Sequence, residues 1–222
     1  MAQTRFGAIG CAKGVALERK KEKREAFGEI ETEHPRYLGV QDTYYVGNIK
    51  GVGRIYQQTF IDMYTRVSFA KLYQSKLAIT SAYILNDRVI PFFEDQQVPL
   101  LRVLTDRGTE YMGKPEHHEY ELYLQIEGIE HSKTQVRHPQ SNGICERLHR
   151  TMQEEFYAVA FRKKLYTSLE EMQADLDEWM SYYNNERSHS GRYCYGKTPM
   201  ATFKKSLILA WQKMIGQPAP AA

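Results

Sequence analysis

Apolar residues divide the chain into a strand-rich part followed by a part in which strands and helices alternate. Residues 38 to 73 are rich in Val, Ile, Tyr, Thr and Phe, and glycines interrupt them. The polar segment Asp62–Arg66 gives a further turn signal. This region therefore predicts an antiparallel meander of three strands.

Helical spacing begins after the meander. Apolar residues recur at this spacing from Ala78 to Phe92, and Pro91 is expected to kink or end the helix. The apolar run Val98–Leu104 predicts a strand that ends at Asp106. A second helix is expected over about residues 116–127, ending at Gly128, and residues 129–136 predict another short strand.

Two more helices are predicted after the loop His138–Gly143. The first has an apolar face formed by Ile144, Leu148, Met152, Phe156 and Val159. The second begins with the capping box Ser168-x-x-Glu171. Three strands in a meander, followed by strands alternating with helices, predict an α/β fold: a mixed sheet flanked by helices.

One main domain accounts for this pattern. Residues 37–205 are expected to form the folded core, after a basic linker or exposed tail over residues 1–36 and before a C-terminal tail over residues 206–222. The charged run Leu17–Glu25 lacks an apolar stripe. It is compatible with a solvated segment or with a patch that grips DNA.

Composition excludes several classes of protein. The chain has 222 residues, 42% of them hydrophobic, and it carries no apolar run long enough to span a bilayer and no signal peptide, so a cytoplasmic protein without a membrane partner is expected. Three separated cysteines argue against a disulfide framework or a zinc ribbon. The net charge of +3 permits a nucleic-acid partner without requiring one.

Three carboxylates are candidates for the chemistry. Asp42 lies within a predicted strand, where partial burial of its charge calls for a cation, a metal or water at the sheet edge. Asp106 ends another strand, either as the start of a turn or as a ligand in the crevice at the carboxyl ends of the strands. Glu146 falls in the first turn of a helix, where the helix dipole favours it and from which it can point back across the sheet.

Hard oxygen donors of this kind suit Mg²⁺ or Mn²⁺ better than zinc. Two such ions can polarise the attacking oxygen and stabilise the leaving oxygen of an in-line phosphoryl transfer. The three acids therefore predict metal-dependent phosphoryl transfer with two ions held by Asp42, Asp106 and Glu146.

The segments around these acids resemble the Asp-Asp-Glu signature of bacterial insertion-sequence transposases and retroviral integrases. Asp42 lies in Gln-Asp-Thr-Tyr-Tyr, Asp106 in Leu-Thr-Asp-Arg-Gly-Thr-Glu-Tyr, and Glu146 in His-Pro-Gln-Ser-Asn-Gly-Ile-Cys-Glu-Arg. The likeness extends to Ile61–Arg66, to Tyr182–Arg187 with His189, and to Gly196–Pro199, and covers about residues 37 to 203.

The resemblance implies a ribonuclease-H-like fold, dependence on Mg²⁺, and strand transfer in which a DNA 3′-hydroxyl attacks a target phosphodiester. It implies DNA, both transposon ends and target, as the partner, and a homo-oligomer assembled on that DNA. Two features depart from the family. The 39 residues from 107 to 145 exceed the usual spacing by a few, which indicates an insertion around Met112–Glu121. The helix-turn-helix that finds transposon ends is not visible, which fits a fragment or a truncated product.

Other acids and histidines compete for the same roles. Asp62 fits a turn, Asp87 falls on the exposed side of its helix, and Glu110 is the closest rival as third ligand. The histidines at 117, 118 and 131 match no standard zinc spacing and are expected at the surface or with satisfied partners.

Basic and amide side chains near the acids are candidates for DNA contacts. Cations can neutralise approaching phosphates, and amides can reach base edges or sugars. Ordinary surface charge is the alternative for the cations. The candidates are Arg107, Lys133, Arg137, Gln140, Asn142, Arg147 and Arg150.

Three functions stay open at the level of sequence. The first is a polynucleotidyl transferase, a transposase or integrase core that carries out DNA integration, recombination and transposition. The second is a catalytically idle truncated transposase that only binds DNA or a partner transposase. The third is a ribonuclease-H-fold nuclease. The intact acid triad favours activity, and the loop motif and the Tyr-Tyr-Asn-Asn segment favour a transposase over a nuclease.

Overall fold

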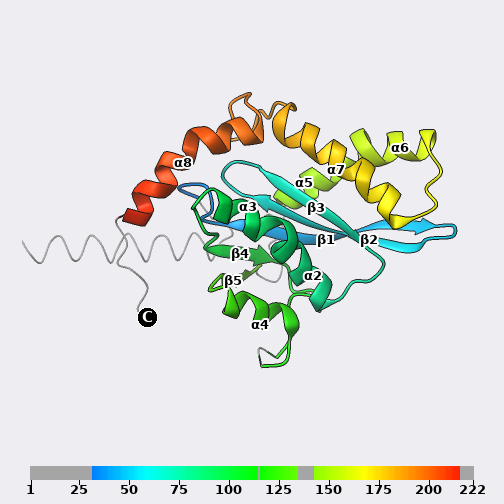
Figure 1. Ribbon diagram of the computed structural model, residues 1–222, viewed down its shortest axis with the longest axis horizontal. Coiled ribbons are helices and arrows are strands. Elements are labelled where there is room, and N and C mark those ends of the chain that lie inside the picture. The colour runs from blue at the N-terminus through cyan, green and yellow to red at the C-terminus, as the bar shows by residue number, and fades with distance from the viewer. Residues whose placement is uncertain (1–31, 115, 135–142, 216–222) are drawn as a thin grey trace, which may run out of the picture.

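A computed structural model of the chain describes residues 32–114, 116–134 and 143–215. Its sheet has five strands in the order β3-β2-β1-β4-β5 (Figure 1). The strands are β1 (Gly39–Ile49), β2 (Gly53–Asp62), β3 (Ser68–Tyr73), β4 (Arg102–Thr105) and β5 (Glu130–Lys133).

The first three strands form the predicted antiparallel meander. Gly51 and Gly53 have positive φ angles of 87° and 100° in the turn between β1 and β2, a conformation that glycine adopts without steric cost. β2 pairs with β1 and β3 in antiparallel register, whereas β4 pairs in parallel with β1 and β5. The mixed sheet expected from the sequence is therefore confirmed.

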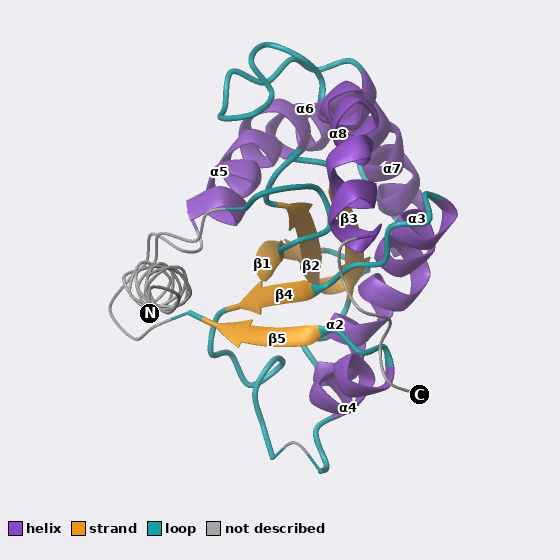
Figure 2. Cartoon of the chain, turned by 90° about the vertical axis from the view of Figure 1, so that its left-hand side faces the viewer, coloured by secondary structure: helices purple, strands orange, loops and turns teal. Residues whose placement is uncertain are grey.

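Helices cover both faces of this sheet (Figure 2). On one face, α5 and α7 bury Leu148, Met152 and Leu176 against the strands. On the other face, the segments α2, α3, α4 and α8 form a second core around Phe93 and Phe203. The helices are α2 (Ala78–Ile84), α3 (Ile90–Asp95), α4 (Glu119–Ile126), α5 (Gly143–Met152), α6 (Ala158–Lys163), α7 (Leu169–Asn185) and α8 (Pro199–Ile215).

Two local predictions have clear structural outcomes. The helix expected to kink or end at Pro91 does not end there but continues to Asp95. A π-helical turn over Leu85–Val89 precedes Pro91, which falls in the first turn of α3. The capping box at α7 is present, since the Ser168 hydroxyl accepts a hydrogen bond from the Glu171 amide at 3.2 Å.

The folded part extends further than the predicted core of residues 37–205. Leu207 and Ala210 continue the helical spacing of Phe203 along α8 and are buried, so residues 206–215 form helix and not a tail. Arg36 is also buried, at the other end. The expected tails over residues 1–31 and 216–222 lie outside the described residues. Within the described ranges, no helix has the length and apolarity needed to cross a membrane.

Candidate active site

Asp42 lies in β1, and Asp106 directly follows β4, the parallel neighbour of β1. The pairs between β1 and β4 are Gly39 with Val103 and Val40 with Leu104. Asp42 is three residues beyond Gly39, and Asp106 is three residues beyond Val103. Both carboxylates therefore lie at the same level near the carboxyl end of β4, where folds of this kind place their ligands.

Backbone amides orient both aspartates. One carboxylate oxygen of Asp42 accepts a hydrogen bond from the Thr43 amide at 2.9 Å. An oxygen of Asp106 accepts one from the Gly108 amide at 2.8 Å, which makes a tight turn. Asp106 thus both follows the end of β4 and begins a turn, as the two interpretations of the sequence expected.

His149 is the basic group beside Asp42. Its Nδ1 lies 3.8 Å from Asp42 Oδ2, and the Asp42 side chain is 15% exposed. Burial lowers the pKa of His149 to about 4, and its Nε2 lies 3.0 Å from the Thr59 hydroxyl. His149 is therefore neutral beside Asp42 at neutral pH.

Glu146 reaches the same region from α5. The helix is held against β1 by the Cys145 thiol, which donates a hydrogen bond to the Val40 carbonyl at 3.6 Å. Burial, followed by the charges of Asp42 and Glu146, raises the pKa of this thiol. Both carboxylates are therefore close to Cys145. Figure 2 shows β4 and β5 ending on the side of the molecule on which α5 begins.

The donor set suits a divalent cation, although the three acids do not form a closed cluster. Asp42 and Asp106 are partly exposed and Glu146 is exposed, so their oxygens can be reached from solvent. Among the described residues, no three His, Cys, Asp or Glu side chains lie close enough together to hold one ion. The structure thus shows three hard oxygen donors on adjoining elements and not a formed metal centre.

Glu110 and Lys76 form an ion pair next to the aspartates. Glu110 is 2% exposed, and its Oε1 lies 2.8 Å from Lys76 Nζ. Burial works against the lysine charge, but Glu110, followed by Asp106 and Asp42, raises the pKa of Lys76. Sequence reasoning did not single out Lys76, because nothing near it in the sequence signals that it lies beside the acids.

The other rivals have structural partners. Asp62 is fully buried and accepts hydrogen bonds from the Thr65 and Arg36 amides, as a turn residue does. Asp87 forms an exposed ion pair with Lys71 at 2.5 Å. His131 lies 2.9 Å from a carboxylate oxygen of Glu121. The structure therefore gives each of these side chains a partner other than a metal.

The DNA-contact candidates fall into three groups. Arg137, Gln140 and Asn142 lie outside the described residues. Lys133 and Arg107 contact the protein: Lys133 pairs with Glu121 at 2.6 Å, and Arg107 donates to the Thr134 carbonyl. Arg147 and Arg150 are exposed on α5, and Arg150 lines a cavity of about 320 Å³ with Glu146 and Tyr44.

The sequence matches known integrases in two comparisons. Residues 127–199 match the family described as integrase core domain. A curated relative named "Putative integrase ORF3", from Spiroplasma virus SpV1-C74, is 28% identical over 189 residues. This alignment covers 78% of the chain and 51% of the relative, so the chain spans about half the length of that relative.

Solved integrase structures share the fold. The HTLV-2 integrase catalytic core domain, solved in complex with magnesium, has a TM-score of 0.57 at 12% identity, with 78% of this chain and 99% of that chain covered. The catalytic core domain of BIV integrase has a TM-score of 0.56 at 19% identity, with 80% and 99% covered. A simian T-cell lymphotropic virus intasome complex gives 0.60 at 13% identity, with 86% and 58% covered.

The mixed five-stranded sheet between helices is the ribonuclease-H-like fold of integrase catalytic cores. In its fold, and in sequence over residues 127–199, the chain is therefore similar to integrase catalytic cores.

Proposed function

We propose that this chain is the catalytic domain of a DNA transposase or integrase, with Asp42, Asp106 and Glu146 as the ligands of divalent metal ions. The observation that carries the proposal is the matched position of Asp42 and Asp106 on paired parallel strands. Glu146 comes to them on a helix that is hydrogen-bonded to the same strand as Asp42.

Each acid has a distinct part in this proposal. Asp42 and Asp106 are oriented by backbone amides and present fixed oxygens, whereas Glu146 is exposed and can reorient on α5. Three carboxylates are the oxygen donors that Mg²⁺ or Mn²⁺ prefers. Bound there, two such ions would supply charge stabilisation for the attacking and leaving oxygens of an in-line displacement.

Lys76 adds a positive charge near the acids. Its ion pair with buried Glu110 holds the ammonium group within electrostatic reach of Asp106 and Asp42. The charge reduces the repulsion between the two aspartates in the absence of metal. Lys76 is therefore a positioning residue, and Glu110 holds it in place.

The proposal extends to the substrate of the chain and to its oligomeric state. The structural neighbours include an intasome complex and HTLV-2 cores in trimeric and dimeric forms. We infer that this chain likewise acts on DNA as a homo-oligomer, joining transposon ends to a target. Candidate contacts to the DNA are Arg107, Lys133, Arg137, Gln140, Asn142, Arg147 and Arg150.

Cleavage of a branched DNA that mimics a strand-transfer product, in the presence of Mn²⁺, tests the proposal. The purified chain should process this DNA because a pre-assembled substrate supplies the positioning that end recognition otherwise provides. Asp42→Asn, Asp106→Asn and Glu146→Gln should each lower the rate by a factor of about 10³ or more, since each removes a charged metal ligand.

Two control variants make the result specific. Asp87→Asn changes an exposed acid that is paired with Lys71 and should retain full activity. Glu110→Gln tests the rival third ligand and should retain more activity than Glu146→Gln. Loss of activity in Glu110→Gln with full activity in Glu146→Gln would overturn the assignment. An unmutated chain that binds the branched DNA without processing it would support the idle form.

A further inference from the structure

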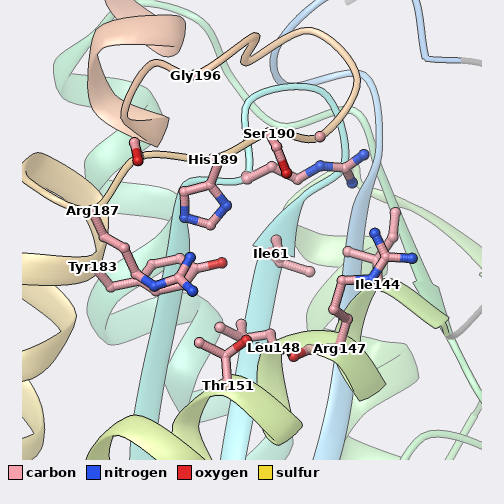
Figure 3. Close-up of a pocket in the computed structure, with 13 residues that line it drawn as sticks. Ile61, Ile144, Arg147, Leu148, Thr151, Tyr183, Arg187, His189, Ser190 and Gly196 are labelled. Atoms are coloured by element: carbon pink, nitrogen blue, oxygen red, sulfur yellow. Dashed lines mark hydrogen bonds between the residues drawn. The ribbon is translucent and has the colours of Figure 1, made fainter.

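A second cavity lies across α5 from the acids. It has a volume of about 430 Å³ and is formed by the turn after β2, by α5, and by the end of α7 with the segment that follows it (Figure 3). Two segments singled out in the sequence, Ile61–Arg66 and Tyr182–His189, meet here, and the acid site uses neither of them.

Two guanidinium groups face this cavity without a carboxylate partner. Arg66 and Arg147 both line it, and no carboxylate in the described part of the chain forms an ion pair with either of them. Nη1 of Arg66 is buried and has no hydrogen-bond partner among these residues. Burial lowers the pKa of Arg66, and the charge of Arg147 acts in the same direction, whereas Cys194, Asp62 and Tyr183 act against it. The cavity therefore holds two guanidinium groups that no ion pair engages among these residues.

His189 is a further unsatisfied group. Its Nε2 is buried without a hydrogen-bond partner in the described residues. Burial, followed by the charges of Arg187 and Arg66, lowers the pKa of His189 to about 4. Arg187 differs from the other two arginines, since Glu155 engages it through two bonds of 2.8 and 2.7 Å. The groups that lack an acceptor are thus the guanidinium groups of Arg66 and Arg147, and the unpartnered Nε2 of His189 lies in the same cavity.

The walls of the cavity are held in place before any ligand binds. Arg66 has a φ of 69°, unusual for a residue other than glycine, and its amide donates to the Asp62 carbonyl at 2.9 Å. Tyr193 stacks on Tyr64 at 4.2 Å, and the Cys194 thiol donates to the Thr65 carbonyl. These contacts fasten the segment after α7 to the turn after β2.

The chemistry of the cavity fits a phosphate group. Arginine pairs with phosphate oxygens through several parallel hydrogen bonds, and the hydroxyls of Ser188 and Ser190 provide additional donors. Arg147 is exposed at the edge, whereas the Nη1 of Arg66 is buried. An anion carried on a larger molecule can therefore enter past Arg147 and reach Arg66.

We propose that this cavity, which we call the Arg66 pocket, binds a phosphate group of DNA at a point separate from the acids. The inference rests on the proposed function, because DNA is the phosphate-bearing partner that the acid site would act on. Arg147 and Glu146 are consecutive on α5, and consecutive side chains of a helix point about 100° apart, so the pocket and the acids lie on different sides of this helix.

Two binding measurements on the full chain test this proposal. The first is thermal unfolding with inorganic phosphate against chloride at equal ionic strength, since a ligand that binds the folded state raises the melting temperature. The second is the anisotropy of a fluorescent branched DNA over a series of salt concentrations. Arg66→Gln should abolish the phosphate effect, weaken DNA binding about tenfold, and reduce the salt slope by about one.

Three further variants test whether the effects of Arg66→Gln are specific to the pocket. Arg162→Gln removes an exposed arginine of α6 that does not line the pocket, and it should bind DNA like the unmutated chain. Arg66→Lys should restore part of the affinity lost in Arg66→Gln, and His189→Gln should give a smaller loss than Arg66→Gln. Melting temperatures of all variants show whether each of them folds.

The outcomes are distinct. Phosphate stabilisation that Arg66→Gln removes, with unchanged DNA affinity, means an adventitious ion only and overturns the proposal. Unchanged phosphate and DNA binding in Arg66→Gln also overturns it. Weaker DNA binding in Arg66→Gln, in a chain that never processes the branched DNA, supports the pocket and contradicts the proposed catalytic function.

Discussion

The two exposed sides of α5 carry different chemistry on one short helix. Glu146 and Arg150 line the cavity next to β1, together with Tyr44. Arg147 and Thr151 line the Arg66 pocket on the other side. The two residues of each pair are four positions apart and therefore lie on the same face of the helix. Consecutive residues, such as Glu146 and Arg147, point about 100° apart.

A buried stripe separates these two sides. Cys145, Leu148 and Met152 are almost fully buried and fasten the helix to the sheet. A helix that packs on the sheet through one apolar stripe can therefore present a carboxylate, Glu146, to one site and a guanidinium group, Arg147, to another. Neighbouring residues such as Glu146 and Arg147 should therefore fail in different ways when they are changed.

The largest expected effect separates Glu146 from Arg147. Glu146→Gln should lower the rate of processing branched DNA by a factor of about 10³ or more and leave the Kd for DNA within about twofold. Arg147→Gln should raise the Kd five- to tenfold, roughly, because it removes a phosphate contact, with little change in the rate at saturating DNA. Single-turnover rates and anisotropy titrations measure both quantities.

An equal loss of rate and of affinity in both variants would contradict the assignment of Glu146 and Arg147 to two sites, because it would mean that the two sides of α5 belong to one site. Thr167→Ala, distant from α5 at the entrance to α7, provides a control that should change neither quantity.

A substitution in the buried stripe of α5 should lower the stability of the fold and so disturb both exposed sides of the helix. Met152 is fully buried, and its sulfur accepts a hydrogen bond from Gln57 at 3.3 Å. Met152→Ala should lower the free energy of unfolding by about 2–5 kcal/mol, whereas Met152→Leu should cost less than about 1.5 kcal/mol. Urea unfolding measures these losses, with exposed Glu154→Ala as the control. A loss below about 1 kcal/mol for Met152→Ala would show that the stripe does not fix the helix.

Much of the fold was predictable from local patterns. The meander has glycine turns and β-forming residues, and β1 to β3 follow the predicted segments. The extent of α8 was also visible, since Leu207 and Ala210 continue the spacing of Phe203, although the predicted core ended at residue 205. The continuous helix through Pro91 was not predictable, because the π-helical turn that precedes it is a feature of packing.

The two sites differ in how far sequence reasoning could reach. The strand positions of Asp42 and Asp106 followed from the apolar residues around them, and their roles as ligands stay predictions. Lys76 and the Arg66 pocket were missed. Arg66, Arg147 and His189 are far apart in sequence and meet only because α5 and the segment after α7 pack beside the turn after β2. Neither spacing nor periodicity reports such a contact.

The smallest expected effect concerns the pH dependence of the Arg66 pocket. The pKa of His189 is lowered to about 4 in the folded chain, below its ordinary value of 6.5, first by burial and then by Arg187 and Arg66. The unfolded chain therefore binds the additional proton more readily, and folding stability is lost as the pH falls from about 6.5 towards 4. His189→Gln should remove about 1 kcal/mol of this loss. Urea unfolding at pH 7.5 and pH 5 measures this loss of stability. Saturating inorganic phosphate should make the loss smaller in the unmutated chain, because a bound anion favours the protonated imidazole.

An equal loss of stability in His189→Gln and the unmutated chain, with and without phosphate, would show that His189 does not face the anion.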